Sequence, residues 1–137
     1  MSLLSKGFTL TGPLISLSII ALLAAIAIPR ILKTNMADNE SAARATLKTI
    51  STALETYAAR SGQGYPTDIL ALIIADPAYL NKNYIADSPV QGYDYVCESL
   101  EVNGYSCSAE PQYCGRTGSK IYTITTGGVF TETECTQ

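Results

Sequence analysis

The sequence contains no histidine, and none of its four cysteines stands in a C-x-x-C pair. Without imidazole, the usual catalytic triads and the mixed Cys/His zinc sites are excluded, and the cysteine spacing does not fit a four-cysteine zinc site. The acidic side chains are scattered, so no pair of carboxylates stands out as a general acid and base. We therefore predict that the protein is not an enzyme and has neither a cofactor nor a bound metal ion.

Positive charge is also scarce. Nine Lys and Arg residues stand against twelve Asp and Glu residues, which gives a formal net charge of −3. Binding to nucleic acid needs a basic surface that neutralises phosphates, and the sequence has no convincing cluster of that kind. We expect neither a nucleic-acid partner nor a small-molecule partner.

Charge is absent altogether from residues 7–28, which read GFTLTGPLISLSIIALLAAIAI. A helix needs about 20 apolar residues to cross the hydrocarbon core of a membrane, so this run is long enough to span one. Alternatively, it is the apolar part of a secretory signal peptide that is cut after Ala27, because Ala25-Ile26-Ala27 has the small-x-small pattern. The extension of the run to Ile28 and the proline at position 29 favour a retained helix.

The cysteines all lie in the last third of the chain, at Cys97, Cys107, Cys114 and Cys135. Two disulfides are the better interpretation, and disulfides indicate an oxidising compartment outside the cytoplasm. Four cysteines allow three pairings. Cys97 and Cys107 lie on adjacent predicted strands, which favours a bond between them and, by elimination, a bond between Cys114 and Cys135.

Residues 37–60 are predicted to form the exposed half of a long helix whose first half is the apolar run. The helix is expected to begin at or near Pro13, and Pro29 predicts a kink or local melting at residues 25–29. An apolar stripe recurs at spacings of three and four: Ala43, Leu47, Ile50, Leu54 and Tyr57. Such a stripe is typical of a helix that is buried along one face.

A short helix is expected at residues 68–73, capped by Thr67 and followed by a loop or a second short turn. Strand-like segments follow, with a hairpin turn at Thr126-Gly127-Gly128 between the last two: Tyr93–Cys97, Tyr105–Ser108, Lys120–Thr125 and Val129–Thr131. The predicted fold class is therefore α+β, with a long N-terminal helix packed on a small C-terminal antiparallel sheet.

Two motifs at the ends of the apolar run are more specific. Residues 6–10 read Lys-Gly-Phe-Thr-Leu, and residues 23–29 read Leu-Ala-Ala-Ile-Ala-Ile-Pro. Together they resemble the N-terminus of type IV pilins and type II secretion pseudopilins. The resemblance implies that a prepilin peptidase cuts between Gly7 and Phe8 and that the new N-terminus, Phe8, is methylated. It also implies a pilin-like fold.

The resemblance divides the chain into a leader peptide at residues 1–7, a transmembrane and filament-core helix at 8–30, and a globular domain at 31–137. Assembly residues carried over from the family are Phe8, Thr9, Leu10, Gly12, Pro13 and Pro29. Gly12 departs from the family, which usually has a glutamate at this position that pairs with the terminal amine of a neighbouring subunit. This departure favours a minor or initiating subunit. Alternatively, the amine of Phe8 pairs with Thr11, Ser16 or backbone carbonyls.

The resemblance implies a structural subunit of a type IV pilus or a pilus-like filament. Its partners would be copies of itself or related pilins in a helical filament, the inner membrane and prepilin peptidase. The precursor would lie in the inner membrane and the filament in the periplasm or outside the cell. The alternative is a minor or tip pilin, or a monomeric module that is anchored or secreted and acts in adhesion or DNA capture.

Overall fold

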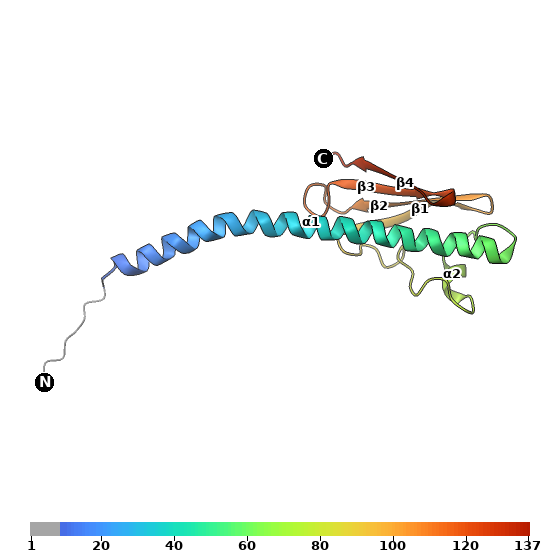
Figure 1. Cartoon of the computed structure of the whole chain (residues 1–137), viewed down its shortest axis with the longest axis horizontal. Coiled ribbons are helices and arrows are strands. Elements are labelled where there is room, and N and C mark those ends of the chain that lie inside the picture. The colour runs from blue at the N-terminus through green and yellow to red at the C-terminus, as the bar shows by residue number, and fades with distance from the viewer. Residues whose placement is uncertain (1–8) are drawn as a thin grey trace, which may run out of the picture. The chain divides into compact units, whose positions relative to one another are not determined.

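The computed structural model describes residues 9–137 of the chain, which divides into two compact units, Met1–Thr34 and Asn35–Gln137. A single helix, α1 (Thr11–Ser61), contributes residues to both units (Figure 1). The order of elements after it is α2 (Leu70–Ile74), β1 (Tyr93–Glu101), β2 (Gly104–Pro111), β3 (Lys120–Thr125), a 3₁₀ turn (Thr126–Gly128) and β4 (Val129–Glu134).

In the first unit, α1 begins two residues before Pro13, and its first hydrogen bond joins the Leu14 amide to the Leu10 carbonyl at 3.4 Å. Pro13 fits because the amides of the first helical turn have no intrahelical acceptor in any case, so its missing N–H removes no bond. The expected local melting at Pro29 is wrong, since α1 is helical on both sides of this residue. A proline removes only one hydrogen bond, and the neighbouring turns keep theirs.

In the second unit, α1 buries the predicted apolar stripe. Ala43, Leu47 and Leu54 are fully buried, Ile50 is 1% exposed, and Tyr57 is half-buried against this core. The helix ends one residue beyond the expected Arg60. Gly62 follows it with a φ of 66°, and its amide donates to the Ala58 carbonyl at 3.2 Å. A glycine in this left-handed conformation commonly terminates helices, because it carries no Cβ.

The four strands form one antiparallel sheet in the order β1-β2-β3-β4, so each strand pairs with the next one along the chain. The predicted turn at residues 126–128 does connect β3 to β4. All strands except β3 are longer than the sequence predicts, because pairing continues into flanking residues that show no strand pattern of their own. The predicted α+β fold class is thus confirmed, with α1 packed on the sheet.

The core lies between α1 and one face of the sheet and is rich in tyrosine. Tyr93 and Tyr122 are fully buried, and Tyr95 and Tyr105 are at most 3% exposed. On the other side of α1 in Figure 1 runs the segment that carries α2.

The helix α2 (Leu70–Ile74) begins two residues later than predicted. At its N-terminus the Leu70 amide donates a hydrogen bond to the Asp68 carboxylate at 3.0 Å. The expected cap at Thr67 is therefore wrong. Asp68 lies two residues before that amide, a spacing at which an aspartate readily bonds the backbone.

Candidate functional site

The first unit exposes an apolar helical surface. Large apolar side chains on it are between 53% and 80% exposed: Leu10, Leu14, Ile15, Leu17, Ile19, Ile20, Leu22, Leu23, Ile26, Ile28, Ile31 and Leu32. Apolar area of this extent is unfavourable in water, at roughly 25 cal/mol per Å². In the described chain, α1 is the one helix that is long and apolar enough to cross a membrane, judged by length and composition.

The two serine side chains of the apolar run form hydrogen bonds within the helix itself. The Ser16 hydroxyl donates to the Gly12 carbonyl at 3.1 Å, and the Ser18 hydroxyl donates to the Leu14 carbonyl at 2.9 Å. A hydroxyl without a partner is costly in hydrocarbon. Because both hydroxyls bond to the preceding turn, the segment can enter an apolar environment without leaving these donors unpaired.

Two of the predicted site residues, Gly7 and Phe8, lie outside the described residues, as does the predicted cut between them. Thr9 and Leu10 are exposed immediately before α1. Gly12 lies in the first turn, and a Cβ added to it would meet no other atom within 4 Å. Pro13 is in the same turn, and Pro29 is exposed just before Arg30, the first cation after the apolar run.

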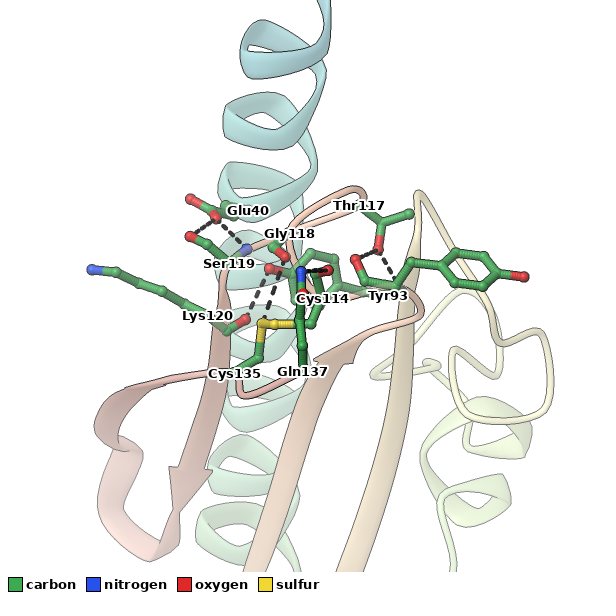
Figure 2. The surroundings of a disulfide bond; sticks show 10 residues. Glu40, Tyr93, Cys114, Thr117, Gly118, Ser119, Lys120, Cys135 and Gln137 are labelled. Atoms are coloured by element: carbon green, nitrogen blue, oxygen red, sulfur yellow. Dashed lines mark hydrogen bonds between the residues drawn. A yellow bond between two sulfur atoms is a disulfide. The ribbon is translucent and has the colours of Figure 1, made fainter.

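Two disulfides cross-link the second unit, Cys97–Cys107 and Cys114–Cys135. These are the pairs that the sequence favours. The first bond links directly opposite residues of β1 and β2. The second ties the C-terminal tail to the loop between β2 and β3, as Figure 2 shows. Disulfides together with an apolar N-terminal helix indicate a location outside the cytoplasm, at or beyond a membrane.

The loop closed by Cys114–Cys135 is held to α1 by Glu40 (Figure 2). The Glu40 carboxylate accepts from the Ser119 amide at 2.9 Å and from the Ser119 hydroxyl at 2.7 Å. The side chain of the preceding residue, Asn39, donates to the Thr117 carbonyl at 3.0 Å. Nothing in the sequence singles out Glu40, because its partner lies 79 positions away.

Glu55 makes a second link between α1 and the sheet. Its carboxylate accepts from the hydroxyls of Tyr65, at 3.0 Å, and Tyr105, at 2.9 Å, and from the Gly127 amide at 2.7 Å. Burial raises the pKa of Tyr105 to about 12, and burial together with the nearby Glu55 carboxylate raises the pKa of Tyr65. Both hydroxyls therefore stay protonated and donate at neutral pH.

No family model matches the chain, and no curated protein is significantly similar to it in sequence. Function is therefore inferred from the residues and the fold alone.

Proposed function

We propose that this protein is a structural subunit of a pilus-like filament of the type IV pilin class. The observation that carries the proposal is the exposed apolar surface of residues 9–34, which is joined through one helix to a disulfide-bonded α+β unit. Such a segment needs either lipid or other apolar helices around it. A subunit of this kind stays in the membrane before assembly and exchanges lipid for neighbouring helices within a filament.

Processing follows from the same proposal. Prepilin peptidase cuts between Gly7 and Phe8, and Phe8 becomes the methylated N-terminus. A cut at this point removes residues 1–7, including Lys6, and keeps the whole apolar helix. The mature chain therefore retains the segment through which it assembles.

Intact-mass measurement of the protein recovered from the cell surface tests the proposal. The expected mass is that of residues 8–137 with one added methyl group and two disulfides. Electron microscopy of the same sheared material should show filaments that contain this chain. A surface form that begins at Ile28 contradicts the proposal, because it lacks the apolar segment needed to build a filament.

Gly12 favours a second candidate function, that of a minor or tip subunit. In the pilin class a glutamate at this position pairs with the terminal amine of a neighbouring subunit, and glycine supplies no carboxylate. A minor subunit would be present in few copies per filament. Quantitative mass spectrometry of purified filaments separates the two, because a major subunit dominates the protein content.

A further inference from the structure

A groove of about 510 Å³ runs along α1 in the second unit. Exposed residues of α1 line one side of it, and residues 77–79 line the other. Thr49, Thr52 and Thr56 line its floor on α1. Each of these hydroxyls donates to the carbonyl four residues earlier, at 2.9, 2.8 and 2.6 Å respectively. Since the hydroxyls are occupied by the backbone, the threonine methyl groups give the floor an apolar character.

A cation stands at each end of this groove. Lys48 and Arg60 both line it, and they are separated along α1 by about 18 Å, at 1.5 Å per residue. The Lys48 ammonium lies 5.8 Å from the centre of the Phe130 ring, and the Arg60 guanidinium lies 5.9 Å from the centre of the Tyr79 ring. Within residues 9–137 neither cation forms a salt bridge. Both charges are therefore free to meet carboxylates of another molecule.

The edge strand β1 carries the opposite charges: an apolar side chain lies between two acidic ones. Val96 is 47% exposed, and because it alternates with the buried Tyr95, it lies on the sheet face away from α1. Asp94, two residues earlier, shares that face, and Glu98 is exposed at the bulge two residues later. At about 3.3 Å per residue, the two carboxylates are about 13 Å apart along the strand. An apolar side chain thus stands between two acids.

Asp94 also faces a like charge. It pairs directly with Glu110 of β2, and no salt bridge joins either carboxylate to a cation within residues 9–137. Like charges directly opposite in a sheet destabilise it. A cation supplied by another molecule would relieve this repulsion.

We propose that the groove at Lys48 and Arg60 of one copy binds the Asp94-Val96-Glu98 segment of a second copy. Val96 covers the threonine methyl groups while the long cationic side chains reach the two flanking carboxylates. The contact rests on the proposed filament function and specifies which surfaces of the second unit join. Because the groove and the acidic segment are two different surfaces of this unit, the contact is heterologous, and heterologous contacts build rings or open filaments.

Zero-length cross-linking of the protein in whole cells, which hold both its membrane-bound and its assembled copies, tests the contact directly. A carbodiimide condenses a carboxylate with the Lys48 amine into an amide and itself takes up the water. We expect a covalent dimer whose linked peptides join Lys48 to Asp94 or Glu98. Lys48→Arg keeps the charge but has no amine to couple, so this link should disappear. Absence of the link from the wild-type protein overturns the inference.

Charge reversal gives a second test. Lys48→Glu with Arg60→Glu, or Asp94→Lys with Glu98→Lys, should each lower the amount of assembled filament by about tenfold, because like charges facing across an interface are strongly unfavourable. Combining all four substitutions should restore assembly. Arg116→Glu and Glu134→Lys, exposed positions outside both surfaces, serve as controls.

The outcomes separate this inference from the proposed function. Filaments that tolerate every reversal contradict the contact and leave the filament function intact. The cross-link without any filament supports the contact and contradicts the filament function.

Acids on an edge strand also prevent strand-to-strand aggregation. If that is their only role, Asp94→Asn with Glu98→Gln will increase association between copies, whereas the proposed contact predicts a decrease.

Discussion

The hydroxyl of Tyr105 donates a hydrogen bond of 2.9 Å to the carboxylate of Glu55, which joins strand β2 to helix α1 across 50 positions of the sequence. The Ser51 hydroxyl lies 2.7 Å from the same tyrosine oxygen. Because the tyrosine proton is directed to Glu55, Ser51 acts as the donor in this second bond. The three side chains form a polar link at the margin of an otherwise apolar core.

We predict that Glu55→Gln lowers the free energy of unfolding of the second unit by about 1–3 kcal/mol, since hydrogen bonds to a charged group contribute more than neutral ones. Denaturant unfolding of the full-length protein in detergent, followed by circular dichroism, measures the change. Glu134→Gln is the control, because this exposed residue at the end of β4 should change stability by less than about 0.5 kcal/mol. Equal effects of the two substitutions would contradict a structural role for Glu55.

Unfolding at alkaline pH should be coupled to ionisation of the buried tyrosines. Burial raises the pKa of Tyr105 from 10.0 to about 12 and also raises that of Tyr93. A group whose pKa is raised by folding contributes its full stabilisation at a pH below its pKa in the unfolded state. This contribution is lost as the pH rises through the pKa of the folded state. The free energy of unfolding should therefore fall from about pH 10 upwards.

Ultraviolet absorbance of tyrosinate, recorded together with circular dichroism, checks this pH dependence. The buried tyrosines should ionise together with loss of structure. Tyr105→Phe should make the pH dependence shallower, because one buried titrating group is removed. A pH dependence that Tyr105→Phe leaves unchanged would contradict this assignment.

Replacing both Cys114 and Cys135 by serine should lower the free energy of unfolding by about 3 kcal/mol, given a loop closed over 21 positions. The Cys97 and Cys107 double replacement should cost less, because that bond spans 10 positions within a hairpin that is already paired. Denaturant unfolding of the two full-length variants compares them. The reverse order of stabilities would show that loop length does not decide these contributions.

Gly118 lies against the hydroxyl end of Tyr93, and a Cβ at this position would occupy the space of the tyrosine ring. Gly118→Ala should therefore destabilise the second unit by about 1–3 kcal/mol, the usual cost of overpacking. Gly12→Ala is the matched control, since no atom lies within 4 Å of the place that its Cβ would take and this residue belongs to the first unit. A melting curve for each variant gives the comparison, and a stable Gly118→Ala protein would show that Tyr93 can move aside.

Ile20→Lys should displace the protein from membranes. A lysine near the centre of a transmembrane helix costs about 3 kcal/mol, which lowers insertion strongly. Ile74→Lys is the control, because Ile74 is 80% exposed in the second unit and should remain in water. Fractionation of cells expressing each variant measures membrane retention. Equal retention of both variants would contradict membrane insertion of the first unit.

Local pattern explains why much of the fold could be predicted. The apolar run, the stripe from Ala43 to Tyr57 and the turn at residues 126–128 each depend on neighbours a few positions apart, and the structure contains the helix and the hairpin that these patterns predict. Where local rules compete, the predictions are wrong. Residues 25–29 keep their helical structure at Pro29, against the expected local melting, and Asp68 instead of Thr67 makes the hydrogen bond at the start of α2.

The sequence by itself determined the apolar segment, the helical stripe, the α+β class and the favoured disulfide pairs, because periodicity, charge and spacing are properties of a chain read in order. Only the tertiary structure decided that Glu40 binds Ser119, that Glu55 joins two tyrosines and a turn, and that a groove with a cation at each end lies along α1. Most of these contacts join residues tens of positions apart in the chain, and no local rule specifies which polar groups packing brings together.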